Sequence, residues 1–238
     1  MICKDIYCAA KSYFYRIYKN FKMIALLLTL VGLAFLHSLL TAAACRAAGV
    51  AIREVSIGTG KEILRCGLFS IRCIPFGASV SCWELQDLDE DEAALRGATL
   101  YENQPVLVRT MIILSGNLGL IVLALVLAGS EGWEAFTSGF SEFFSGALNP
   151  EVNGVQYLQS AQSYISTHSW LNYLPFVAAK VAAWNLLPLS SLNGGQMVML
   201  LLSSSELMKK LFHKYSSIFL MVMLACWLFA LFRWMSGH

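Results

Sequence analysis

Apolar residues fall into four long runs that carry very little charge. The runs cover residues 23–45, 107–129, 170–204 and 214–235. A bilayer core of roughly 30 Å is crossed by about 20 helical residues, and each run is near that length or longer. Pro188 lies inside the third run, and a proline interrupts a helix because it lacks the backbone donor. The pattern predicts an α-helical integral membrane protein with about four transmembrane helices, one of them broken at Pro188.

The composition agrees with a membrane location. Of the 238 residues, 57% are hydrophobic and only 13% are charged, and the mean hydropathy is +0.61. A soluble domain of this length would need more charge on its surface. We therefore expect the partners to be the lipid bilayer and another membrane protein or transmembrane helix, with no nucleic acid among them.

The cysteines predict neither a disulfide framework nor a structural metal site. The chain has seven of them, an odd number, and Cys45 and Cys226 lie in apolar runs, where a thiol behaves as a small hydrophobic group. Cys66, Cys73 and Cys82 are spaced by seven and nine residues, unlike the short paired spacing of a structural zinc site.

The segment between the first two runs predicts a small hairpin sheet. Short β-favouring stretches over residues 50–83 are separated by Gly58, Gly60, Gly67 and a turn at 75–77. We place this β element at the cytoplasmic membrane face. An acidic run follows at 84–92, and it predicts a solvated connector because it lacks the glycine and carbonyl spacing of a calcium loop.

Two segments are predicted to lie at the membrane interface. Residues 1–22 mix basic and aromatic side chains and predict a helical interfacial segment, with an ordinary charged flank of the first span as the alternative. Residues 130–169 hold aromatic residues spaced by three and four among glutamates, which predicts an extracytoplasmic amphipathic helix ending at Asn149-Pro150.

The charge distribution gives conflicting evidence on orientation. Residues 130–179 contain no Lys or Arg, whereas the loop at 209–214 is basic, so the positive-inside bias places the first outside and the second inside. Four alternating spans would then put the N-terminus outside, yet its five basic residues favour the inside. A half-inserted N-terminal segment or a further re-entrant element would resolve the conflict.

Five short motifs occur in order along residues 23–205. They are His37-Ser38-Leu39-Leu40-Thr41, Ser56-Ile57-Gly58-Thr59-Gly60-Lys61, Ile74-Pro75-Phe76-Gly77, Arg109 with Ser115-Gly116, and Asn185-Leu186-Leu187-Pro188 followed by Leu192-Asn193-Gly194-Gly195. Together they resemble the site-2 protease family of intramembrane zinc metalloproteases, particularly its bacterial regulator-of-sigma-E branch without the PDZ insertion. The resemblance implies a single membrane domain over 23–238 in a multi-pass protein of the bacterial inner membrane.

The resemblance also implies that the zinc site is degenerate. In the family, two histidines one helical turn apart and an aspartate bind zinc, and a glutamate acts as general base. Here His37 matches the first histidine, but Ser38 replaces the glutamate and Thr41 the second histidine. Asn193 replaces the aspartate. With one ligand of three, we expect neither catalysis nor zinc, and a neutral amide and a hydroxyl are poor substitutes.

The remaining motif residues are expected to build a binding cavity. Asn185, Pro188, Gly194 and Gly195 should keep the helix break, which needs shelter from lipid by protein or by a water-filled cavity. Ser56, Gly58 and Gly77 mark strands that would bind an unwound segment as an added strand.

Two polar residues inside apolar runs each allow two interpretations. The Lys180 ammonium would either border the vacant site, reaching Asn193, Asn185 or a backbone carbonyl, or extend to the membrane interface. His37 would either keep a ligand role or be a buried histidine hydrogen-bonded to Thr41.

The leading hypothesis is a pseudoprotease that binds a transmembrane or juxtamembrane segment of a partner protein without cutting it. The alternative is an active intramembrane metallopeptidase with a non-standard zinc site that includes His37. A third possibility, a lipid- or ion-handling protein, depends on Lys180 alone.

Overall fold

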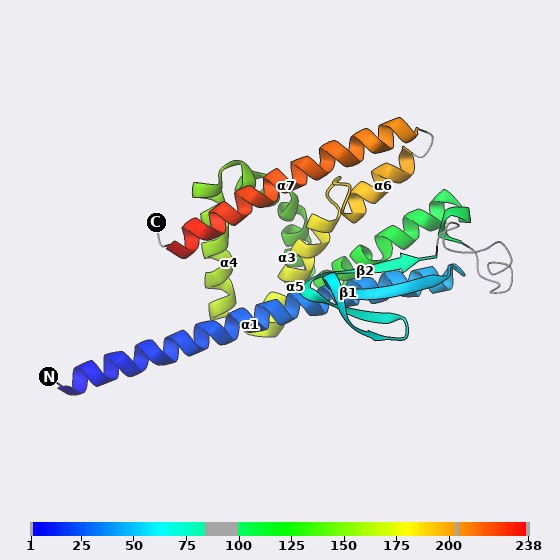
Figure 1. Ribbon diagram of the computed structural model, residues 1–238. Coiled ribbons are helices and arrows are strands. Elements are labelled where there is room, and N and C mark those ends of the chain that lie inside the picture. The colour runs from blue at the N-terminus through cyan, green and yellow to red at the C-terminus, as the bar shows by residue number, and fades with distance from the viewer. Residues whose placement is uncertain (1, 84–99, 203–204, 237–238) are drawn as a thin grey trace.

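A computed structural model describes residues 2–83, 100–202 and 205–236 (Figure 1). The acidic run at 84–92 lies outside the described residues. The elements in chain order are α1 (Ile2–Ala47), β1 (Ile52–Cys66), β2 (Phe69–Cys82), the 3-10 turn η2 (Tyr101–Asn103), α3 (Val106–Leu148), the π turn η3 (Pro150–Gly154), α4 (Val155–Thr167), α5 (Trp170–Asn185), α6 (Asn193–Leu201) and α7 (Glu206–Ser236). Helices with one small antiparallel sheet make up this structure, as predicted.

Three helices among the described residues are long and apolar enough to cross a membrane. They are Ile24–Ala47, Val106–Leu148 and Glu206–Ser236. The predicted third run instead forms two short helices, α5 with 16 residues and α6 with 9 residues. The chain is therefore an integral membrane protein with a broken helix, while the predicted count of four spans is not confirmed.

The predicted interfacial segment at the N-terminus is helical and runs without interruption into the first span. Residues 2–47 form the single helix α1, whose N-terminal end extends away from the rest of the molecule (Figure 1). Whether this end lies at the membrane interface stays a prediction.

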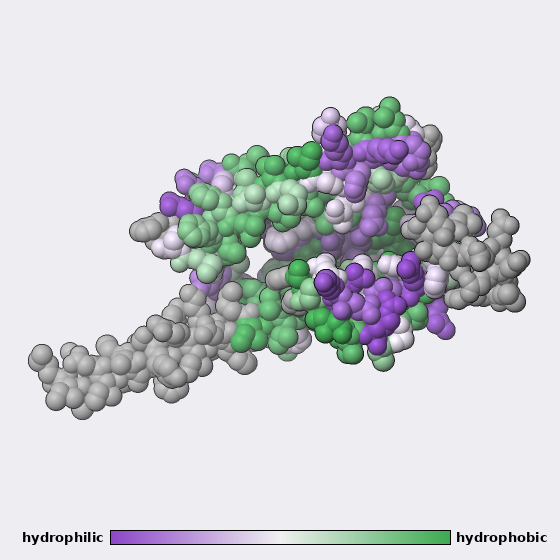
Figure 2. All heavy atoms as spheres, viewed as in Figure 1, coloured by the Kyte–Doolittle hydropathy of each residue, from purple (hydrophilic) through white to green (hydrophobic). Residues whose placement is uncertain are grey.

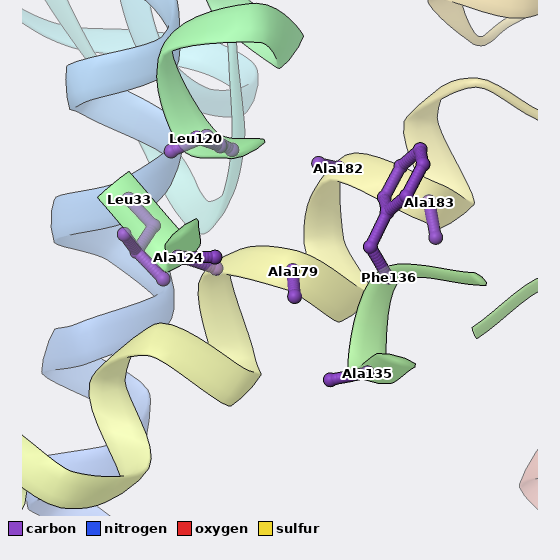
Figure 3. Packing of buried hydrophobic residues seen from close by; sticks show 9 residues of the cluster. Leu33, Leu120, Ala124, Ala135, Phe136, Ala179, Ala182 and Ala183 are labelled. Carbon is purple, nitrogen blue, oxygen red and sulfur yellow. The ribbon is translucent and has the colours of Figure 1, made fainter. Parts of the chain in front are cut away.

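Helix α3 bends sharply at Gly129, where φ is 56° and ψ is −132°. Beyond the bend the aromatic face of the helix packs inward in part, because Phe136 and Phe143 are buried while Trp133 is 50% exposed. Phe136 joins the core between α1, α3 and α5, beside Ala179, Ala182 and Ala183 (Figure 3). The predicted helix is present as the second half of α3, with part of its face packed against α5, and its place at the outer membrane interface stays a prediction. Its predicted end is confirmed, since Asn149 caps α3.

The sheet is more folded than a simple hairpin. β1 and β2 are antiparallel, and Ile57 of β1 lies opposite both Ile71 and Ala78 of β2. The first half of β1 thus lies between two parts of β2, and Gly58 and Gly60 permit the curl with φ near 86° and 88°. Phe69 packs edge-on against Phe35 at 6.3 Å between ring centroids, which fixes the sheet along α1.

Candidate functional site

The imidazole ring of His37 in α1 packs against Gly116 of α3. A Cβ atom on Gly116 would lie 2.5 Å from the imidazole, so a larger residue would displace the ring. Asn117, the next residue, is completely buried and lies beside the same ring. The small residue predicted at the start of this span therefore lets α3 approach His37 closely.

Asn193, the first residue of α6, makes two hydrogen bonds through its side-chain nitrogen. Nδ2 lies 3.0 Å from His37 Nε2 and 2.9 Å from the Ile113 carbonyl oxygen. Because a carbonyl oxygen only accepts, the Ile113 contact requires the NH2 end of the amide, and that end cannot accept from a ring N–H. His37 Nε2 is therefore the acceptor, and a neutral imidazole in this arrangement carries its proton on Nδ1.

Ser38 and Thr41 occupy the same stretch of α1. The predicted hydrogen bond between Thr41 and His37 is present, but the Thr41 hydroxyl donates to the backbone carbonyl of His37 at 3.0 Å, whereas the His37 ring bonds Asn193. Ser38 is 1% exposed, and its hydroxyl has no hydrogen-bond partner among the described residues. Both residues line the cavity beside His37, but each offers only a neutral hydroxyl, which is a weak base and a poor zinc ligand.

The break between α5 and α6 depends on the two glycines that follow Asn193. Cβ atoms on Gly194 and Gly195 would lie 2.1 Å and 2.0 Å from the carbonyl oxygens of Leu186 and Leu189. Only glycine lets the segment fold back on the start of α6 so closely. The segment is also anchored to α7, because the Ser190 backbone N–H donates to Ser216 Oγ at 2.7 Å.

A cavity of about 630 Å³ lies beside the His37–Asn193 pair. Its wall includes His37, Ser38, Thr41, Asn185, Asn193, Gln196 and residues 77–83 of β2 and its end. Figure 2 shows hydrophilic residues gathered around a hollow between the sheet and α7. The structure thus brings five of the predicted site residues and Gly77 together around one cavity with both polar and apolar walls.

A comparison with protein families identifies the scaffold. The model of Peptidase family M50, the site-2 protease family, matches residues 25–230. The chain belongs to peptidase family M50. No curated protein sequence matched the chain in a second comparison. The M50 match covers α1 through most of α7, so it includes every element around the cavity.

M50 is a metallopeptidase family, but the residues at this site do not fit a zinc ion. Catalytic zinc takes three protein ligands with available lone pairs. Here the Nε2 lone pair of His37 accepts from Asn193, which offers N–H groups at the place of a carboxylate. Thr41 offers only a neutral hydroxyl, whose proton is donated within α1 and which is a poor substitute for an imidazole ligand.

Lys180 does not line the cavity beside His37 and Asn193. Its Nζ is 2.7 Å from Glu142 Oε1 and donates to Ser138 Oγ at 2.7 Å, both on the second half of α3. The hypothesis that its ammonium reaches Asn193 or Asn185 is wrong, because the ion pair between α3 and α5 holds it. Sequence spacing gave no signal for a partner 38 positions earlier in the chain.

The other predicted residues occupy separate places. Ser56 shares a hydrogen bond of 2.8 Å with Ser79 inside the sheet. A Cβ atom on Gly58 would lie 2.4 Å from the Ile74 carbonyl oxygen. Pro188 is exposed at the helix break. Ser56 and Gly58 therefore shape the sheet behind the cavity wall, while Asn117 and Gln196 are site residues that the motifs did not reveal.

Proposed function

We propose that this M50 chain is a pseudoprotease that binds a transmembrane or juxtamembrane segment of a partner protein without cutting it. It would act as a regulator or an assembly factor, as a multi-pass protein of the bacterial inner membrane. The observation that carries the proposal is the hydrogen bond from Asn193 to His37 Nε2.

That hydrogen bond supports loss of catalysis because it uses the lone pair that a metal would need. A carboxylate at position 193 could bind a metal, but an amide N–H pointing at the ring cannot. The Ile113 carbonyl holds the amide in this orientation. Ser38, where the family has its general base, is a buried hydroxyl that cannot take a proton from water near neutral pH.

Retention of the cavity supports a binding role. Residues 78–82 of β2 pair with β1 along one edge, and among the described residues no third strand pairs with them. Their backbone can therefore receive an extended segment as an added strand. The neutral amides and hydroxyls of the cavity wall can satisfy the polar groups of a segment that unwinds there.

No observation favours the alternative of an active metallopeptidase with a non-standard site. It would need further ligands to converge on His37. Within the described ranges, no cluster of three or more His, Cys, Asp or Glu side chains could hold a metal ion. The lipid- or ion-handling alternative also loses its support, since Lys180 pairs with Glu142.

Photocrosslinking tests the proposal with a defined probe. A benzoylphenylalanine is placed at Ser79 on the cavity wall, and the probe is a single-pass protein whose transmembrane helix contains an Asn-Gly interruption. We expect a crosslink to the intact probe. The control position is Ile63, which lies on the hairpin away from the cavity. Its side chain is 68% exposed, and a benzoylphenylalanine there should give little crosslink.

A second probe with an uninterrupted Leu-rich helix distinguishes binding that requires an unwound segment from non-specific binding of an apolar helix. Equal crosslinking of both probes, or equal yields at Ser79 and Ile63, would argue against a binding role for the cavity. A probe cleaved by wild-type protein but not by a His37→Ala variant would identify an active protease and overturn the proposal.

A further inference from the structure

Two thiols meet where α1 ends and β2 ends. Cys45 Sγ lies 3.8 Å from Cys82 Sγ, although 37 residues separate them in the sequence. Cys45 is 1% exposed, whereas Cys82 is half-buried. Both line the 630 Å³ cavity, so the contact belongs to its wall rather than to a remote surface.

The backbone around both cysteines holds them in this arrangement. Cys82 lies opposite Ile52 in the sheet, and the Val50 N–H donates to the Cys45 carbonyl at 2.9 Å. Cys45, Val50 and Ile112 form a buried cluster against which Cys82 packs. A disulfide needs its sulfurs about 2 Å apart, so small side-chain and strand movements would close the remaining gap.

We propose that Cys45 and Cys82 are a redox-modification site, a dithiol that a low-molecular-weight disulfide such as glutathione disulfide converts to an internal disulfide. The bond ties the end of β2 to α1 and fixes one wall of the cavity. At a cytoplasmic membrane face, where thiols are normally kept reduced, such a bond is transient and serves as a sensor.

The chemistry runs by two exchange steps. Cys82, the more accessible thiol, attacks glutathione disulfide as its thiolate, and one glutathione thiolate leaves. Either thiol can donate in the Cys45–Cys82 contact, and donation from Cys45 stabilises the Cys82 thiolate. Cys45 then loses its proton to the released thiolate and attacks the Cys82 sulfur, expelling the second glutathione. Two protein thiols are oxidised, and glutathione disulfide is reduced to two thiols.

The experiment uses the full chain in detergent micelles, equilibrated in glutathione buffers of increasing oxidised fraction. A background variant replaces Cys3, Cys8, Cys66, Cys73 and Cys226 with serine. We expect one transition in which the intact mass falls by two hydrogens, with a Cys45–Cys82 linked peptide. Hydrogen exchange of residues 77–83 should slow by about tenfold in the oxidised protein, because the strand opens less often.

The matched variant is Cys45→Ser, which removes the resolving thiol. It should accumulate a glutathione adduct on Cys82 that wild-type protein does not keep. A stable adduct on Cys82 with Cys45 still reduced, or no reaction in fully oxidised buffer, would overturn the proposal. The same peptide mapping on wild-type protein decides the question if the five-serine background does not fold.

Discussion

The side-chain amide of Asn193 donates to His37 Nε2 at 3.0 Å and to the Ile113 carbonyl oxygen at 2.9 Å. Because the Ile113 carbonyl can only accept, it fixes the NH2 end of the amide toward both the carbonyl and the imidazole. Because Nε2 cannot accept this hydrogen bond and bind a metal with the same lone pair, the two states exclude each other. Asn193 and His37 are the positions that the resemblance matched to two zinc ligands of the family, and in this M50 chain a hydrogen bond joins them.

Asn193→Asp should destabilise the protein. A carboxylate cannot donate, so the Ile113 carbonyl loses its donor and faces a negative charge, and His37 must move its proton to Nε2 to bond the new side chain. The expected loss is about 1–3 kcal/mol in the free energy of unfolding, measured by denaturation in detergent. Asn185→Asp is the matched control, since it adds the same charge to the same cavity. Equal losses in both variants would contradict a role for the donor.

Gly195→Ala should be strongly destabilising. The added Cβ would lie 2.0 Å from the Leu189 carbonyl oxygen, and a backbone atom cannot rotate away, so overpacking of about 3 kcal/mol or more is expected. Gly32→Ala is the control in α1, because a Cβ there meets nothing within 4 Å. It should leave thermal stability unchanged or raise it, since alanine favours a helix. Similar melting temperatures for the two variants would contradict the close approach.

Lys180→Met should destabilise the α3–α5 contact by leaving the Glu142 carboxylate without its cation. The side chains are only 24% and 29% exposed, and removal of one partner from such a pair costs about 3 kcal/mol. The double variant Lys180→Met with Glu142→Leu should recover most of that loss. A double-mutant cycle of unfolding free energies measures the coupling, and additive losses would show that the pair contributes no interaction energy.

The apolar runs were enough to predict α1, the helical start of α3, the break after α5 and the final helix α7. They could not predict the bend at Gly129, because a glycine before a segment with glutamates is also compatible with the end of a span. The inward packing of Phe136 depends on its contact with α5, a relationship between segments that periodicity within one segment does not contain.

The motifs identified the members of the site but not their interactions. The resemblance to the site-2 protease family placed His37 and Asn193 on the two sides of one site, because the matching motifs meet in that family. It could not reveal that the amide donates to the ring, since the orientation depends on the Ile113 carbonyl. Nor could it pair Lys180 with Glu142, because both lie on helices that meet only in the folded chain.

Stability of the sheet should fall in acid through Glu54. Its carboxylate accepts hydrogen bonds from Ser70 and from Arg72, and these contacts lower the pKa of Glu54 in the folded protein. The stabilisation is therefore complete above the unfolded pKa of about 4.3 and is lost as the pH falls from there through the lowered folded pKa.

Glu54→Gln checks this dependence. The variant should lose about 1–3 kcal/mol at pH 7, and its melting temperature should vary less between pH 6 and 3 than that of wild-type protein. Glu62→Gln is the control, because the Glu62 side chain is 39% exposed and pairs with Arg65 at the surface, where an ion pair contributes little. A wild-type acid profile retained in Glu54→Gln would contradict the assignment.

Metal analysis of the purified protein tests the central claim most directly. Wild-type protein and a His37→Ala variant are isolated from zinc-supplied cells without chelators, and zinc per chain is measured by mass spectrometry. The Asn193–His37 hydrogen bond predicts far less than one zinc per chain in wild-type protein, with the same content in His37→Ala. One zinc per wild-type chain that is lost in the variant would contradict the account.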